Sequence, residues 1–155
     1  MTFKTLIRAA AVAALAVTAA GAASAQDASL RANFGEISLS AGFTPDPYTV
    51  SITAGGSVNG GNLPGACTGM ISNAPDFQVT YRAGSLPLVF RTISSADTTL
   101  IINGPDGRWY CDDDSYGDGD AEVRFSRPQS GVYDIWVGTF SGGTARATLS
   151  ITETP

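Results

Sequence analysis

Histidine is absent from the sequence, and the only lysine is Lys4. Histidine is the side chain that most readily exchanges protons near neutral pH, so Ser-His-Asp and Cys-His catalytic sites are excluded. A Ser-Lys dyad is excluded from the remainder of the chain because it holds no lysine. A carboxylate pair for glycoside hydrolysis stays open by composition alone. We nevertheless expect no enzyme, since the densest group of carboxylates, Asp112–Asp120, lacks apolar neighbours that would hold a proton on one of them.

Long apolar runs are also lacking beyond residue 25. Lys4 and Arg8 precede a run of small apolar residues, Ala9–Ala23, which ends at Ala23-Ser24-Ala25. This pattern predicts a secretory signal peptide over residues 1–25 that is cleaved before Gln26. The run is too short for a bilayer, which needs about 20 apolar residues. We therefore expect no membrane span, and a secreted or periplasmic protein.

Positive charge is scarce in the predicted mature chain. Residues 26–155, long enough for a single domain, carry all 14 carboxylates but only seven of the nine cations, and these seven are arginines. The resulting net charge of −7 argues against nucleic acid as a partner, because binding a phosphate backbone requires clustered cations.

Cysteine is limited to Cys67 and Cys111. An even number of cysteines in an exported chain favours one disulfide. Closing a loop of this length stabilises a protein by about 4 kcal/mol in the chain-entropy model. A zinc site would need two further ligands, and histidine is not there to supply them.

Alternation of apolar and polar residues predicts half-buried β-strands. It is clearest in the segments Tyr48–Ala54, Phe77–Arg82, Ala121–Ser126, Val132–Val137 and Arg146–Thr152, and Phe34–Ala41, Leu86–Ile93 and Thr98–Ile102 are further strand candidates, the last two more apolar and central. Asn103–Gly107 is a strong turn, and Asn59–Asn73 is expected to be a long loop pinned by Cys67. The pattern predicts an all-β, antiparallel β-sandwich or jelly-roll-like fold with eight or nine short strands.

From Ala74 onward the order of features becomes distinctive. Asp97-Thr98-Thr99-Leu100 leads to the Gly104–Gly107 turn, the Asp112–Asp114 run and the strand Gly131–Val137. The segment 74–153 thereby resembles the bacterial pre-peptidase C-terminal domain, a β-sandwich appended to secreted proteases and other exported proteins. The resemblance implies a non-catalytic accessory module, which in some relatives binds calcium or a polymer.

Five carboxylates lie within nine residues, at Asp112, Asp113, Asp114, Asp118 and Asp120. Ca²⁺ takes six to eight oxygen ligands, and such a loop supplies carboxylates and carbonyls. It is not an EF-hand, because Tyr116 and Val123 stand where that loop requires oxygen donors. The five residues are our candidate calcium ligands, with Asp97 and Asp106 as weaker candidates. A solvated acidic hairpin tip is the alternative.

Three aromatic residues are candidates for ligand binding: Trp109, Tyr110 and Trp136. Trp136 alternates with Ile135 and Val137, so it either points outward or packs beneath the Asn59–Asn73 loop. Exposed aromatic rings stack on sugars or anchor protein partners. Gly131-Val132-Tyr133 resembles a tyrosine corner, a structural use of Tyr133.

Two classes of function follow from these features. The first is an exported, calcium-stabilised, non-catalytic module that binds an extracellular or envelope polysaccharide or protein. The second is a structural or interaction subunit of the envelope, or an accessory to a secreted protease. An outward aromatic patch beside the acidic loop would favour the first. A long unprotected edge strand at Phe34–Ala41 or Ala145–Thr152 would favour the second.

Overall fold

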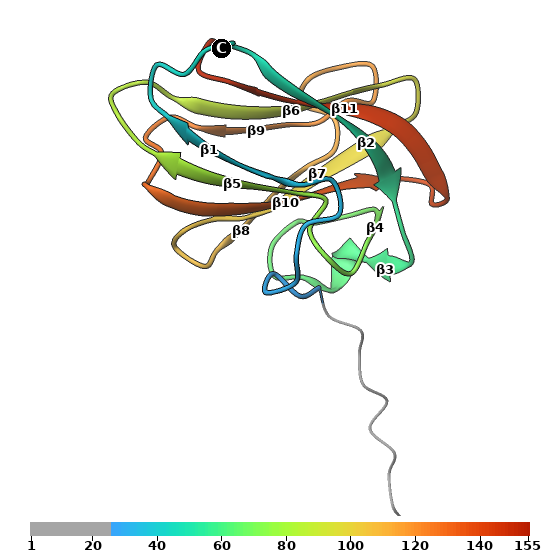
Figure 1. The fold of residues 1–155 in the computed structure, drawn as a ribbon. Coiled ribbons are helices and arrows are strands. Elements are labelled where there is room, and N and C mark those ends of the chain that lie inside the picture. The colour runs from blue at the N-terminus through green and yellow to red at the C-terminus, as the bar shows by residue number, and fades with distance from the viewer. Residues whose placement is uncertain (1–25) are drawn as a thin grey trace, which may run out of the picture.

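The computed structural model describes residues 26–155, and the predicted signal peptide lies outside the described residues. Eleven strands form two sheets packed face to face (Figure 1). The seven-stranded sheet contains β1 (Glu36–Ser40), β3 (Val58–Asn59), β4 (Met70–Ile71), β5 (Phe77–Arg82), β7 (Thr98–Asn103), β8 (Trp109–Asp112) and β10 (Gly131–Thr139). The four-stranded sheet has the order β2 (Tyr48–Gly55), β11 (Thr144–Thr152), β6 (Leu88–Ser94) and β9 (Glu122–Phe125). The predicted all-β sandwich is confirmed.

The strand count exceeds the expected eight or nine because the Asn59–Asn73 segment is not a plain loop. It contains β4, the end of β3 and a short 3-10 turn at Gly60–Asn62. The strands β3 and β4 are two residues long, too short for alternation to reveal them. None of the residues 26–155 forms a helix long and apolar enough to cross a membrane.

The two sheets are antiparallel with one exception, which the sequence did not indicate. β1 runs parallel to β5, with Glu36 beside Gln78 and Ser40 beside Arg82. A parallel pair requires a long connection, and here the chain passes through β2, β3 and β4 before it returns as β5. β6 and β7 are paired on both sides, as expected for the more apolar strands. β11 is paired on both sides as well, so Ala145–Thr152 is not an edge.

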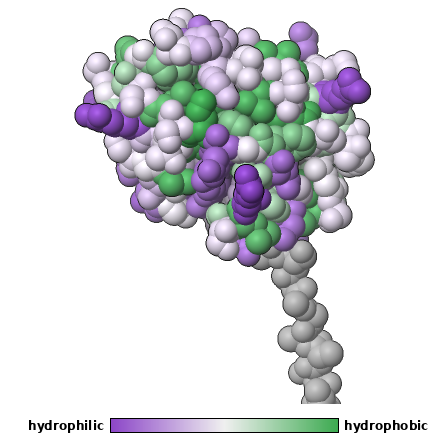
Figure 2. All heavy atoms as spheres, in the orientation of Figure 1, coloured by the Kyte–Doolittle hydropathy of each residue, from purple (hydrophilic) through white to green (hydrophobic). Residues whose placement is uncertain are grey.

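The main core fills the space between the sheets. Alternate residues of each strand point into it, for example Phe77, Val79 and Tyr81 of β5 and Tyr133, Ile135 and Val137 of β10. Each fully buried large apolar side chain stabilises the fold by about 1.5–3 kcal/mol. On the side where β1 and β2 lie, the sandwich is less well closed. Figure 2 shows apolar side chains there, between the two sheets of Figure 1.

A second, smaller core lies outside the seven-stranded sheet. The segment between β3 and β4 folds over one end of that sheet and covers Trp136, which has no exposed surface. Val58, Ile71 and Ile101 pack around the indole. The predicted disulfide between Cys67 and Cys111 is confirmed, and it fastens this segment to β8.

Two polar contacts fix the connections around the core. The Tyr133 hydroxyl donates to the carbonyl of Gln129 at 2.8 Å and accepts from its amide at 3.1 Å, which is the hydrogen bonding of a tyrosine corner. The Tyr81 hydroxyl donates to buried Glu153 at 2.5 Å, and the other carboxylate oxygen of Glu153 accepts from the Gly42 amide at 2.7 Å. The end of the chain thereby holds the connection between β1 and β2 in place.

Candidate functional site

Five side chains form a row across the outer face of the seven-stranded sheet, one from each of five neighbouring strands. The strand register places Glu36 beside Gln78, Gln78 beside Asp134, Asp134 beside Asn103, and Asn103 beside Trp109. Residues adjacent to them in sequence, such as Ile37, Phe77 and Ile102, contribute to the main core, so the five point the opposite way. Four strand spacings of about 4.8 Å give this polar row a length of about 19 Å.

The centre of the polar row is held by one short hydrogen bond. The Gln78 side-chain amide donates to Asp134 Oδ1 at 2.7 Å. Asp134 is only 7% exposed, and burial raises the pKa of its carboxyl while the bond from Gln78 lowers it. Because Asp134 fixes the amide nitrogen of Gln78, the amide oxygen of Gln78 is left as an acceptor for a ligand. Asp134 is thus a positioning residue. Gln78 is only half-buried, so part of its side chain is accessible to a ligand.

A hollow of about 430 Å³ lies at the β1 end of the polar row. It is lined by Glu36, Ser38, Gln78, Thr80 and Ile37. At the other end, Trp109 is half-buried, with its ring centre 5.3 Å from that of Trp136. The face therefore combines carboxylates, amides and hydroxyls with one indole. These are donors and acceptors that suit a ligand rich in hydroxyl groups, together with an apolar ring surface.

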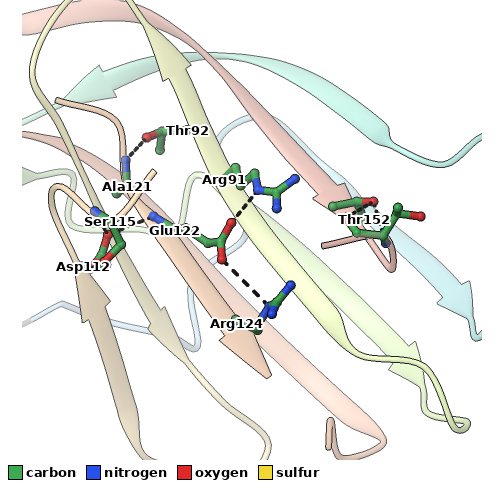
Figure 3. Close-up of polar contacts among 9 residues, drawn as sticks. Arg91, Thr92, Asp112, Ser115, Ala121, Glu122, Arg124 and Thr152 are labelled. Carbon is green, nitrogen blue, oxygen red and sulfur yellow. Dashed lines mark hydrogen bonds and ion pairs between the residues drawn. The ribbon is translucent and has the colours of Figure 1, made fainter. Parts of the chain in front are cut away.

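Two carboxylates of the acidic loop accept hydrogen bonds that fold it, and Figure 3 shows those of Asp112. Asp112 accepts hydrogen bonds from the backbone amides of Ser115 and Glu122, both at 2.9 Å. Asp120 is nearly buried and accepts from the Ser94 amide at 3.0 Å and the Thr98 hydroxyl at 3.3 Å. Two of the five candidate calcium ligands therefore fasten the loop to the sandwich.

Of the remaining three candidate ligands, Asp114 and Asp118 are exposed and Asp113, directly after β8, is half-buried. Burial raises the pKa of Asp113, and the neighbouring charges of Asp114, Asp112 and Asp97 raise it further. Across residues 26–155, no group of three or more His, Cys, Asp or Glu side chains is arranged to hold a metal ion. Asp112 and Asp120 already accept hydrogen bonds from the loop and the sandwich, so their carboxylates would bring fewer free lone pairs to a cation than the other three. Calcium binding stays a prediction.

The loop also packs on the outer face of the four-stranded sheet. Arg91 donates to Glu122 at 2.6 Å, and Arg124 lies 3.9 Å from the other carboxylate oxygen of Glu122 (Figure 3). The Arg91 guanidinium stands 4.7 Å from the centre of the Tyr116 ring. These cations compensate part of the negative charge at the base of the loop.

The three candidate aromatic residues do not form one patch. Trp136 is core, which is the second of the two alternatives, because the segment between β3 and β4 covers it. Tyr110 points toward the main core, packs edge-to-face on Phe125 at 4.8 Å and donates to Asp106 at 2.7 Å. Trp109 faces the opposite side of the same strand. Of the three, Trp109 alone stands on the polar row.

Buried Asp76 has the raised pKa that is typical of a general acid, yet its surroundings are structural. It is 1% exposed, and desolvation raises the pKa of its carboxyl to about 6. Its oxygens accept from the Val137 amide at 2.8 Å and the Ser72 hydroxyl at 3.1 Å. It lines neither the hollow on the polar row nor the other groove described below. Asp76 therefore joins β10 to the segment that precedes β5.

A second groove, of about 450 Å³, lies on the outer face of the four-stranded sheet. Hydroxyl side chains and Arg146 line it together with Ile93 and Phe34, and these two apolar side chains are 47% and 39% exposed. The hydroxyls belong to Ser51 and Thr53 of β2 and to Thr148 of β11. This groove is more apolar at its rim than the polar row.

Comparison with known proteins gives little further guidance. Neither a family model nor a curated protein matches the sequence. Among solved structures, the chain is similar to the crystal structure of Aeromonas hydrophila PliG, a periplasmic lysozyme inhibitor of g-type lysozyme. The identity is 14% and the TM-score 0.42, over 76% of this chain and 96% of that chain. A similarity at this level carries no argument, so the function of this chain is argued from its own residues.

Proposed function

We propose that residues 26–155 form an exported, non-catalytic module that binds an extended polysaccharide along the polar row. The single observation that carries the proposal is the register that lines up Glu36, Gln78, Asp134, Asn103 and Trp109 across five strands. A row of about 19 Å suits a chain of sugars better than one small molecule. Export is supported by the predicted signal peptide.

The strands that carry the polar row are firmly held in the fold, which suits recognition of a hydroxyl-rich ligand. The row stands on strands whose other faces are in the main core, and the disulfide at Cys111 holds the β8 end. The hydrogen bond to Asp134 also holds the Gln78 side chain, and a side chain held in this way loses little conformational entropy when a ligand binds. The β1 end adds the hydroxyls of Ser38 and Thr80 beside the amide of Gln78.

The negative charge of the protein narrows the class of polysaccharide that it is expected to bind. Glu36 and Asp134 are both acidic, and the mature chain carries a net charge of −7. A polyanionic polymer would be repelled by this field, whereas a neutral polymer or one with amino sugars would not. We therefore expect a neutral or cationic polysaccharide. Calcium stabilisation through the acidic loop is a separable part of the proposal, supported by the five carboxylates in that loop.

The proposal is tested by co-sedimentation of residues 26–155 with insoluble neutral and amino-sugar polysaccharides. Removing one hydrogen-bonding group typically costs about 1 kcal/mol. Gln78→Ala and Asn103→Ala should therefore each weaken binding about fivefold, and Trp109→Ala should weaken it at least as much. The matched controls are Ile93→Ala of β6 and Thr148→Ala of β11, on the outer face of the other sheet, and they should bind as the wild type does.

Three results would overturn this proposal. One is that the wild-type chain sediments with no polysaccharide of either class. Another is that the three row variants bind as tightly as the two controls while keeping the wild-type melting temperature. The third is release of reducing ends from a polysaccharide that is lost in Asp134→Asn, because the chain would then be an enzyme.

A further inference from the structure

The four-stranded sheet ends at β2, whose outer edge has no backbone partner in the described part of the chain. β2 pairs with β11 alone. Outside that ladder, no backbone hydrogen bond among residues 26–155 involves Tyr48–Ala54. Thr49, Ser51 and Thr53 are exposed, and Tyr48 and Val50 are half-buried. A strand edge of this kind is a template on which another strand can pair.

β2 differs from the other edges in its composition. Soluble proteins protect sheet edges with charges, prolines or very short strands. The edge strand β1 carries Glu36, β8 carries Asp112, and β9 carries Glu122 and Arg124, while β3 has two residues. β2 has eight residues and neither a charge nor a proline. β2 has none of these protective features, which indicates that another strand pairs with its edge.

The sequence of β2 is nearly palindromic about Ser51. If two copies of β2 pair antiparallel with Ser51 opposite Ser51, Thr49 faces Thr53 and Val50 faces Ile52. Residues that lie opposite each other in an antiparallel pair have their side chains on the same face. Each Ser or Thr side chain thus meets another Ser or Thr, each aliphatic β-branched side chain meets another, and only Tyr48, opposite Ala54, departs from the symmetry. An unrelated partner strand would match these positions only by chance.

We propose that two copies of this chain pair through β2 about a two-fold axis at Ser51 and form one continuous eight-stranded sheet. Such an isologous pair is closed, so it forms a dimer and not a fibre. The second copy would cover the half-buried apolar residues on the open side of the sandwich, which are Ile37 and Leu39 of β1 and Tyr48 and Val50 of β2. Phe34, exposed beside Ser51 and Thr53, would border the same contact.

The charge of the chain sets how the dimer responds to salt. β2 contributes no charge to the contact, so salt removes no attraction there. Two copies of residues 26–155, each with a net charge of −7, repel each other, and salt screens this repulsion. The dimer should therefore become tighter as the salt concentration rises. The polar row stands on the other sheet and meets the proposed contact only at β1, where Ile37 lies, so the dimer is tested by its own variants on β2.

The oligomeric state of residues 26–155 is measured by sedimentation velocity between about 1 and 300 µM, at low and at high NaCl. Ser51→Lys places two like charges face to face on the axis and should weaken the dimer by up to about fivefold. Thr148→Lys, on the neighbouring strand β11 opposite Ser51, is the matched control and should dimerise as the wild type does. Both variants are checked for an unchanged melting temperature.

The register is tested by cross-linking. Directly opposed residues of an antiparallel pair have Cα atoms about 4.5–5.5 Å apart, within the range that a disulfide spans. Ser51→Cys should form a covalent dimer on mild oxidation. Thr49→Cys should not, but a mixture of Thr49→Cys and Thr53→Cys should. A wild-type chain that stays monomeric at 300 µM, or a dimer that tolerates Ser51→Lys and gives no Ser51→Cys cross-link, would overturn the proposal.

Discussion

Asp76 should make the protein more stable in weak acid than at neutral pH. Its carboxyl is buried, and desolvation raises its pKa from the usual 3.8 to about 6. A folded-state pKa above the unfolded one means that the native state binds the proton more tightly. The stabilisation is therefore fully present below about pH 3.8 and is lost as the pH rises through about 6. A difference of about two pKa units corresponds to about 3 kcal/mol in the free energy of unfolding.

Other carboxyls modify the size of the effect. Burial also raises the pKa values of Asp120 and Asp134, which adds to the same trend. Hydrogen bonds lower the pKa values of Asp27 and Asp106, and these exposed groups act in the opposite direction. The Asp76→Asn variant isolates the contribution of Asp76, since the neutral amide still offers an oxygen to the Val137 amide. At pH 7.5 it should be more stable than the wild type by about 1–3 kcal/mol, and near pH 4 the two should be equal.

The assay is guanidinium unfolding of residues 26–155 with the disulfide intact, at steps between pH 4 and pH 8. Glu36→Gln, which removes the carboxyl of an exposed side chain, serves as the control and should follow the wild-type curve. The reasoning is refuted if Asp76→Asn shows the same decline in stability between pH 4 and pH 7 as the wild type. A loss of stability in Asp76→Asn at pH 7.5 would refute it equally, because the buried charge would then be a net benefit.

Three further predictions concern the disulfide, the acidic loop and the tyrosine corner. Replacing Cys67 and Cys111 together by alanine should lower the free energy of unfolding by about 2–4 kcal/mol, measured by guanidinium unfolding. If the double variant is as stable as the wild type, packing alone anchors the segment between β3 and β4. Millimolar CaCl₂, compared with EDTA at matched ionic strength, should raise the melting temperature by an amount equivalent to about 2.7 kcal/mol at 100 times the Kd. The double variant Asp113→Ala with Asp114→Ala should abolish this shift. If the wild type shows no shift, the loop is a solvated tip that binds no calcium. Tyr133→Phe should cost about 1–3 kcal/mol in thermal unfolding because it leaves both backbone groups of Gln129 without their partner, whereas Tyr110→Phe, which removes a bond to exposed Asp106, should cost less.

Local patterns in the sequence predict the strands well but not their neighbours. Alternation indicates Phe77–Arg82 with the bounds of β5, and Tyr48–Ala54 falls one residue short of β2. Alternation also places Trp136 opposite Tyr133 and Ile135, as observed. It does not reveal that β1 joins β5 in parallel, because pairing between distant segments depends on contacts across the whole fold.

The same limit explains why the sequence singles out Trp109 but does not reveal the polar row. Glu36, Gln78, Asp134 and Asn103 each look like an ordinary outward-facing polar residue in its own strand. It is the strand register that brings these four residues side by side, and the register cannot be read from one strand alone. The acidic loop shows the converse case. Five carboxylates close in sequence suggest one site, but the hydrogen bonds of Asp112 and Asp120 draw two of them into the fold.

Both proposed surfaces depend on where β1 and β2 are held, and Glu153 connects the two. Its carboxylate binds the Tyr81 hydroxyl of β5 and the Gly42 amide, which lies between β1 and β2. β1 is an edge strand of five residues, and its ladder to β5 continues in the bond from the Ala41 amide to the Arg82 carbonyl at 2.9 Å. Without the Glu153 contact, β1 has little besides that ladder to fix Glu36 beside Gln78. The C-terminal end of the chain thus positions one end of the polar row and the start of the free edge of β2.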